Sequence, residues 1–206
     1  MNPNFYFKKL DPSDDFVKVA KLILSHELDY HDMLGEFEEN LDVLLLLLKD
    51  SDSIFYYNNF YIVKDKFSEN LVAIGSFRGF RSINSSPFIY KRAFGKLNKE
   101  LPSKFQEVFD ATFKMYDTMT AGGMMSQIIV DPNYRQQGVG SFLLKNLLNL
   151  YGRAPSYLWT GKDNQAAINL YCKFDYEIVD EFDDYSGSGE SRKELKMFRE
   201  GSSVIY

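Results

Sequence analysis

The sequence predicts a mixed α/β sheet with helices on both faces, and three observations lead to that fold class. Strand-like and helical segments alternate along the chain, which then finishes on a hairpin. Hydrophobic residues make up 45% of the sequence and charged residues 26%, values typical of globular proteins and not of disordered ones. The length of 206 residues suits a single domain over 1–206, with a helical insertion at about 82–120.

Each element of the first half has a local signal. The run Asp11-Pro12-Ser13-Asp14-Asp15 is typical of a turn and a helix start, and apolar residues then recur at roughly helical spacing. Acidic residues open the next helix, where the helix dipole favours them, and its leucine block predicts a well-buried helix. The expected order is a strand at 5–10, helices at 14–26 and 36–49, and strands at 54–64 and 71–80 joined by a turn at 66–70.

The middle of the chain carries two helical patterns within 88–120. They are broken at 101–103, and Pro102 fits the first turn of the second helix. After Gly122-Gly123 the pattern changes to a buried strand that Asp131-Pro132 ends. The remaining expected elements are a strand at 124–130, a helix at 139–151, a strand at 156–160, a helix at 164–174, and strands at 176–182 and 194–199 joined by a turn at 186–189.

Charge, cysteine content and hydropathy exclude several classes of protein. The net charge of −5 is a poor match to nucleic-acid binding, which requires a basic surface. The single cysteine, Cys172, rules out an intramolecular disulfide and fits a reducing compartment. The longest apolar run, 43–48, is far shorter than the roughly 18 residues of a membrane span, and the N-terminus lacks a signal-peptide core. We therefore expect a cytoplasmic protein that binds neither nucleic acid nor membrane.

The segment with the strongest chemical signal is the loop that opens the helix expected at 139–151. Gly138 and Gly140 let backbone N–H groups approach a ligand without an intervening side chain. The first turn of a helix carries unpaired N–H donors and a partial positive charge, so phosphate groups bind there. The dinucleotide fingerprint lacks its third glycine, and no nucleotide P-loop motif occurs. The residues alone therefore leave open tight helix packing or another phosphate ligand.

Two blocks of the sequence resemble the GCN5-related N-acetyltransferase (GNAT) family. The first, V-D-P-x-Y-R-x-x-G-V-G, runs from Val130 to Gly140 and matches the strand ending and acyl-CoA loop of that family. The second lies within 163–182, where the family pattern is N-x-x-A-x-x-L/F-Y-x-x-x-G-F/Y. Its matching residues are Asn164, Ala167, Leu170, Tyr171 and Tyr176. Asp175 stands where the family usually has glycine, a mild change because aspartate tolerates the left-handed conformation at a helix C-terminus.

The resemblance implies a mostly antiparallel sheet in which the fourth strand bulges and splays from the fifth, with the pantetheine arm of acetyl-CoA in the gap. The residues it assigns to the arm through their main chain, while their side chains serve the core, are Ile128, Ile129 and Val130. Those it assigns to the pyrophosphate, mostly through N–H groups, are Gln136, Gln137, Gly138, Val139, Gly140 and Ser141. Acetyl-CoA is the implied co-substrate, and a small-molecule or peptide amine is the implied acceptor.

Two residues of the second block receive roles from the resemblance. Asn164 matches a position that commonly hydrogen-bonds the cofactor arm, although an asparagine there would equally cap the helix. Tyr171 matches the frequent general acid of the family. Transfer expels CoA as a thiolate, whose parent thiol titrates near ~8.5, and a phenol near ~10 can donate a proton to it. The structural alternative is a half-buried tyrosine that packs on the sheet, and neighbouring Cys172 is expected to be a small buried residue.

A general base is not evident. The strands expected at 124–130 and 156–160 contain no acid, and Ser126 and Gln127 could hold a water but not accept a proton from an ammonium. The candidates elsewhere are Glu107, Asp117, Asp32, Glu36, His26 and His31. If none serves, either the acceptor amine has a low pKa or the chain is a non-catalytic acyl-CoA-binding module of the same fold. No His/Cys/Asp/Glu grouping has metal-ligand spacing, so no metal is expected.

The insertion at about 82–120 is rich in aromatic residues. They either line an acceptor cavity or form a small core of the insertion itself, and they are Phe88, Tyr90, Phe94, Phe105, Phe109, Phe113 and Tyr116. The basic residues expected to form a solvated face are Lys91, Arg92, Lys96 and Lys99. The resemblance also allows a homodimer.

Overall fold

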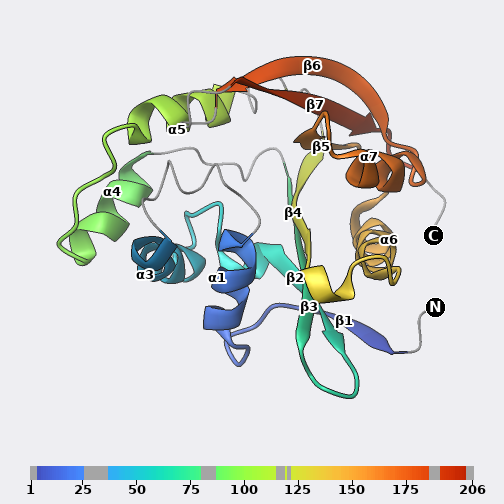
Figure 1. Cartoon of the computed structure of the whole chain (residues 1–206), viewed down its shortest axis with the longest axis horizontal. Coiled ribbons are helices and arrows are strands. Elements are labelled where there is room, and N and C mark those ends of the chain that lie inside the picture. The colour runs from blue at the N-terminus through green and yellow to red at the C-terminus, as the bar shows by residue number, and fades with distance from the viewer. Residues whose placement is uncertain are drawn as a thin grey trace.

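A single sheet forms the centre of the molecule (Figure 1). In the computed structural model, which describes residues 4–25, 37–79, 87–114, 119, 122–185 and 191–202, seven strands pair in the order β1-β2-β3-β4-β5-β7-β6. Only β4 and β5 are parallel among these pairs, so the expectation of a mixed, mostly antiparallel sheet is confirmed. The strands are β1 (Phe5–Lys9), β2 (Phe60–Asp65), β3 (Leu71–Gly79), β4 (Gly123–Val130), β5 (Ser156–Gly161), β6 (Glu177–Tyr185) and β7 (Ser191–Arg199).

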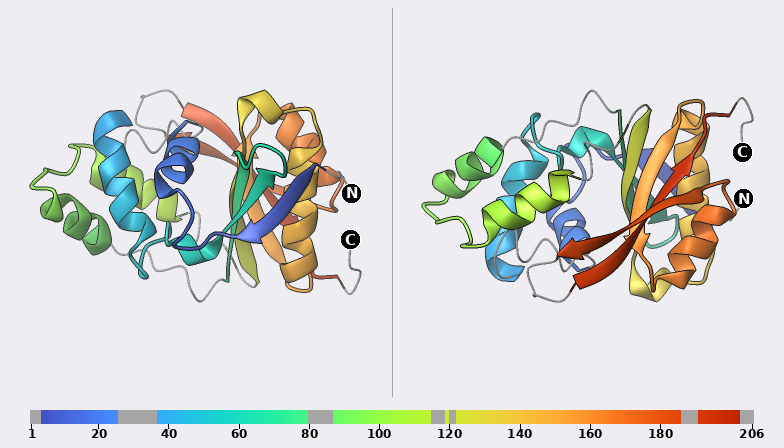
Figure 2. Two further views of the ribbon diagram at one scale, coloured as in Figure 1. Left: turned by 90° about the horizontal axis from the view of Figure 1, so that it is seen from below. Right: turned by 90° about the horizontal axis from the view of Figure 1, so that it is seen from above.

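Helices lie on both sides of the sheet (Figures 1 and 2). One side, called the α1 face below, carries α1 (Phe16–Leu24), α3 (Phe37–Leu48), α4 (Pro87–Lys96) and α5 (Phe105–Lys114). The other, called the α6 face, carries α6 (Val139–Tyr151) and α7 (Gln165–Cys172). Because successive strand residues point to opposite faces, each strand feeds both cores. In β4, for example, Met124 joins the core of the α1 face and Met125 that of the α6 face.

Most elements begin and end close to their expected bounds, and α6 has the bounds that the sequence predicts. The strand expected at 54–64 is partly wrong, because a 3-10 turn at Tyr57–Asn59 precedes β2. Pro102 lies ahead of α5 and not in its first turn, where its carbonyl accepts the N–H of Phe105 at 2.9 Å. Within the described residues, no helix has the length and apolarity required to cross a membrane.

The helices α4 and α5 follow β3 and precede β4, with an aromatic contact between them. The rings of Tyr90, Phe105 and Phe109 lie 5.4–5.6 Å apart and are buried, so these three residues form a core and not an open lining. Phe88 instead is exposed, the Phe113 side chain and Tyr116 lie outside the described residues, and Arg92 pairs with Asp50.

A buried carboxylate ties the first helix to the edge of the sheet. Asp14 accepts hydrogen bonds from Lys64 and Lys8, each at 2.9 Å, and its side chain is 3% exposed. Burial acts to raise the pKa of this carboxyl, but the two lysines prevail and hold it below its ordinary value of 3.8. A folded pKa below the unfolded one stabilises the fold well above pH 3.8, and this contribution is lost as the pH falls through the folded pKa.

Asp14→Asn should therefore lower the free energy of unfolding at neutral pH by about 1–2 kcal/mol, because two charge-assisted hydrogen bonds weaken while both lysines stay partly solvated. Denaturant unfolding measures this loss, and the gap between variant and wild type should shrink at about pH 3, below the ordinary pKa of 3.8, because the unfolded chain takes up the proton before the folded one does. Exposed Asp163→Asn is the matched control and should change little. An Asp14→Asn deficit of equal size at both pH values would contradict this role.

Candidate functional site

The parallel strands β4 and β5 pair only where they begin. Gly123 pairs with Ser156 and Met124 with Tyr157, and no later pair follows. Beyond this point β4 stays with β3 as far as Val130, while β5 stays with β7 as far as Gly161. The strands therefore diverge from a vertex at this last pair. Over residues 125–130, about 20 Å at ~3.3 Å per residue, the β4 edge that faces β5 has no strand partner among the described residues.

A β-bulge in β4 lies next to the vertex. Ile74 pairs with Ile129 and Ser76 with Ser126, so two residues of β4 face one of β3. Gln127, inside the bulge, has a φ of 49°, a left-handed conformation that is uncommon for a residue with a side chain. The expected bulging and splaying of the fourth strand is thus present.

A polar cluster on the α1 face holds the bulge in place. The side-chain oxygen Oε1 of Gln127 accepts from the hydroxyls of Ser76 at 2.9 Å and Ser126 at 2.8 Å, and the two hydroxyls lie 2.7 Å apart. Arg78 adds a hydrogen bond from Nη2 to the Ser126 hydroxyl at 3.1 Å. Ser76, Arg78 and Gln127 are all buried. Sequence reasoning named Ser126 and Gln127 but missed Ser76 and Arg78, because these contacts join residues about 50 positions apart.

The loop after β4 is a row of tight turns. Asp131 accepts the N–H of Asn133 at 2.8 Å, and the Gln137 side chain donates to the Asn133 carbonyl at 3.0 Å. Gln136 and Gly138 have φ values of 60° and 79°. Left-handed residues alternating with others turn successive N–H groups toward one side, an arrangement that binds anions.

The start of α6 continues this row of donors. The first helical hydrogen bond runs from the N–H of Phe142 to the carbonyl of Gly138 at 2.9 Å, and no described side chain caps the helix. The N–H groups of the preceding turn therefore have no acceptor within the helix. A Cβ at Gly140 would lie 3.2 Å from Leu170 and 3.6 Å from Val130, so α6, α7 and the end of β4 meet at this glycine.

The predicted pantetheine-binding strand residues lie along β4 beyond the vertex. Ile129 is buried in the core of the α1 face, while Ile128 and Val130 pack on the core of the α6 face. Their side chains therefore serve the core as expected. Because β4 and β5 are parallel, both strands end on the same side of the sheet, which places the loop at 135–140 and the start of α7 at the open end of the divergence.

Asn164 precedes α7, and Tyr171 lies in its last turn. Asn164 Oδ1 accepts the N–H of Ala167 at 3.2 Å and caps the helix, so the structural role that the sequence allowed is present. Tyr171 is 6% exposed and its ring lies 6.1 Å from that of Tyr176, whose hydroxyl lies 2.7 Å from the Ser156 hydroxyl at the vertex. Asp175 has a φ of 64°, as expected for its place at a helix C-terminus.

The next residues to place are Cys172 and the candidate general bases. Cys172 is exposed, so the expectation of a buried residue is wrong: the last turn of α7 presents this position to solvent while Tyr171 faces the core. Of the base candidates, Glu107 is exposed on α5, and Asp117, Asp32, Glu36, His26 and His31 lie outside the described residues. In the described ranges no group of three or more His, Cys, Asp or Glu side chains is placed to hold a metal ion.

Comparison with known proteins agrees with this geometry. A family model described as the acetyltransferase (GNAT) family matches residues 110–176, the stretch that contains β4, the loop, α6, β5 and α7. A comparison with curated proteins found no match.

Solved structures share the whole fold at low sequence identity. A structure described as an acetyltransferase has 16% identity and a TM-score of 0.67, covering 96% of this chain and 100% of that chain. An N-acetyltransferase from Staphylococcus aureus Mu50 has 16% identity and a TM-score of 0.65, covering 94% and 99%. A chain of the NatC complex bound to Gag peptide and CoA has 14% identity and a TM-score of 0.60, covering 97% and 99%. Residues 110–176 therefore match the GNAT acetyltransferase family pattern, and the chain as a whole shares the fold of solved acetyltransferases.

Proposed function

We propose that this chain is an acetyl-CoA-dependent N-acetyltransferase that acts on a primary amine. The observation that carries the proposal is the divergence of β4 from β5 after Met124. It leaves a strand edge in the sheet that an extended, amide-containing molecule can pair with, as an added strand would. The pantetheine arm of acetyl-CoA is such a molecule, and Ile128, Ile129 and Val130 would supply the backbone partners.

The loop at the open end suits the other half of the cofactor. The N–H groups of 136–141 lie there, the helix dipole of α6 adds partial positive charge, and the Cβ position of Gly138 points into open space. These features fit a pyrophosphate held mainly by backbone donors. Asn164, whose side-chain oxygen is occupied by the helix cap, would offer its amide N–H groups to the arm.

Tyr171 would protonate the sulfur that leaves. In the reaction the amine nitrogen bonds to the acyl carbon, the carbon–sulfur bond breaks, and the electron pair departs with sulfur. A phenol on α7 is a suitable donor because its unperturbed pKa lies above that of the thiol, so it holds its proton until the thiolate forms. The nitrogen releases one proton and the thiolate takes up one, so the reaction is balanced.

The experiment that tests this function combines calorimetry and thiol release. Acetyl-CoA should bind to the purified chain, and a broad panel of primary amines should include one that releases CoA thiol from it. Binding without release by any amine would favour a non-catalytic acyl-CoA-binding module, and failure to bind any CoA species would overturn both. A homodimer and a cytoplasmic location stay predictions from the sequence.

A further inference from the structure

A buried cation lies close to the vertex of β4 and β5. Arg78 of β3 is 2% exposed and sits on the α1 face, since Ile74, four residues earlier, belongs to that core. Its Nη1 donates to the carbonyl of Ile54 at 3.1 Å and its Nη2 to the hydroxyl of Ser126 at 3.1 Å. Its Nε is buried, and no described residue accepts from it. A buried guanidinium is costly unless an anion or a full set of acceptors surrounds it.

No buried carboxylate compensates this charge in the described part of the chain. Besides Asp14, whose carboxylate is paired with Lys8 and Lys64, the buried charged residues there are Arg78, Lys196 and Arg199. Arg199 is accounted for by the carbonyls of Phe174, Gly152 and Glu200, at 3.0–3.1 Å. Arg78 has neutral acceptors only, so among the described residues its charge has no anionic partner.

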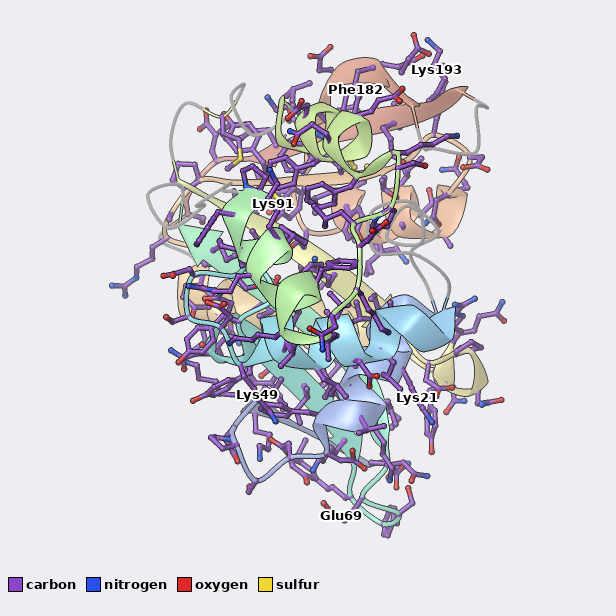
Figure 3. All side chains as sticks on the ribbon, turned by 90° about the vertical axis from the view of Figure 1, so that its left-hand side faces the viewer. Lys21, Lys49, Glu69, Lys91, Phe182 and Lys193 are labelled. Carbon is purple, nitrogen blue, oxygen red and sulfur yellow. The ribbon has the colours of Figure 1, made fainter. Side chains whose placement is uncertain are left out.

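The position of Arg78 relates this charge to the reaction. Arg78 pairs with Met124, and Met124 pairs with Tyr157 in the last row before β4 and β5 diverge. Two strand spacings of about 4.8 Å place the Arg78 and Tyr157 backbones roughly 10 Å apart across the vertex. The Lys196 ammonium lies 4.7 Å from the Tyr157 ring centre, so a second cation occupies the same face. Three further lysines belong to the helical layer that covers this face (Figure 3): Lys21 on α1, Lys91 on α4, and Lys49 just after the end of α3.

We propose that the acceptor is an amine that carries a carboxylate, as a free amino acid does, and that Arg78 binds this carboxylate. The inference rests on the proposed function, which brings the thioester of acetyl-CoA to the same vertex. Nε and Nη2 form one edge of the guanidinium, the edge that binds a carboxylate through two parallel hydrogen bonds. Nε has no acceptor among the described residues, and Nη2 contacts only Ser126. Ser126 is half-buried, so the carboxylate would approach the guanidinium past this residue.

The same charge selects against other acceptors. Polyamines and aminoglycosides carry several positive charges and no anion, so an uncompensated guanidinium beside the reacting group repels them. An amino acid instead presents an anion and an amine on one carbon. Its carboxylate compensates Arg78, while its amine forms the new amide bond and releases one proton.

Matched substrate pairs test the proposal. Each of the common amino acids is compared with its own primary amide, and CoA thiol release from acetyl-CoA is measured for both. The free acid should have the higher kcat/KM, by about ten- to hundredfold, because only the acid can form the charge-assisted pair. Arg78→Met should abolish this preference, and Arg78→Lys, which keeps the charge without the fork, should retain part of it.

The possible outcomes separate the selectivity for acids, the role of Arg78 and the proposed function. A wild-type enzyme that uses amides or carboxylate-free amines as well as acids would overturn the selectivity, whether or not Arg78→Met folds. A folded Arg78→Met variant with the full preference for acids would overturn the role of Arg78. Bound acetyl-CoA with no thiol release by any amine, or no acetyl-CoA binding at all, would overturn the proposed function and the acceptor class with it. The two failures are distinguishable: without thiol release the proposed function is wrong, whereas thiol release without a preference for free acids overturns only the acceptor class.

Discussion

Tyr171→Phe should lower kcat by about 10²- to 10⁴-fold while leaving the affinity for acetyl-CoA nearly unchanged. The phenol would donate its proton to the departing thiolate in the transition state and contribute little to the ground state, so its loss falls on kcat. The substitution keeps the buried ring in the core of the α6 face, so the fold should persist. Single-turnover thiol release with the best amine of the panel measures the effect.

The matched control is the second buried tyrosine beside α7. Tyr176→Phe removes a hydroxyl that lies 2.7 Å from Ser156, so it should cost about 1 kcal/mol of stability and little kcat. If Tyr171→Phe turned over at the wild-type rate under conditions limited by chemistry, Tyr171 would not be the acid. Equal losses of kcat in both variants would assign Tyr171 a packing role.

Gly138→Ala should raise the Kd for acetyl-CoA by about tenfold or more. The backbone at Gly138 has a φ of 79°, where a Cβ costs roughly 1–2 kcal/mol of strain. Relief of that strain would turn the neighbouring N–H groups away from the phosphate position, and the added methyl group would project into the open space that the ligand is proposed to fill. Calorimetry gives the Kd, and thermal unfolding gives the loss of stability.

Gly95→Ala provides the control for that substitution. Gly95 lies in α4, its Cβ position is also open, and no positive φ is present there. Alanine in a helix is favoured over glycine by about 0.5–1 kcal/mol, so this variant should be slightly more stable and bind acetyl-CoA as the wild type does. A Gly138→Ala variant with unchanged Kd would remove the loop from the cofactor site.

The second half of the chain was predictable because its signals are local. The bounds of α6 follow from the glycine loop and the apolar periodicity, and the left-handed Asp175 follows from its place after α7. The first half of the chain was less predictable from the sequence. The aromatic run at 54–59 has strand propensity, yet the chain turns at Tyr57–Asn59 before β2 begins, an outcome that tertiary packing decides.

The polar cluster at the bulge shows the limit of reading residues in order. Ser126 and Gln127 looked like neutral strand residues, and nothing near them in the sequence indicates a guanidinium. Arg78 lies 48 positions before Ser126 in the sequence and reaches it only because β3 pairs with β4. The charge beside the vertex, and with it the proposed acceptor class, is therefore a property of the folded sheet.

The most direct test of the central claim is amide hydrogen exchange with and without saturating acetyl-CoA. If the cofactor pairs with the β4 edge and its pyrophosphate binds the loop, exchange should slow at 128–130 and at 136–141. Helix α4 (Pro87–Lys96), on the other side of the molecule from α6 (Figure 1), should exchange as before. Unchanged exchange in both segments while acetyl-CoA is bound, or protection confined to other parts of the chain, would contradict a cofactor site between β4 and β5.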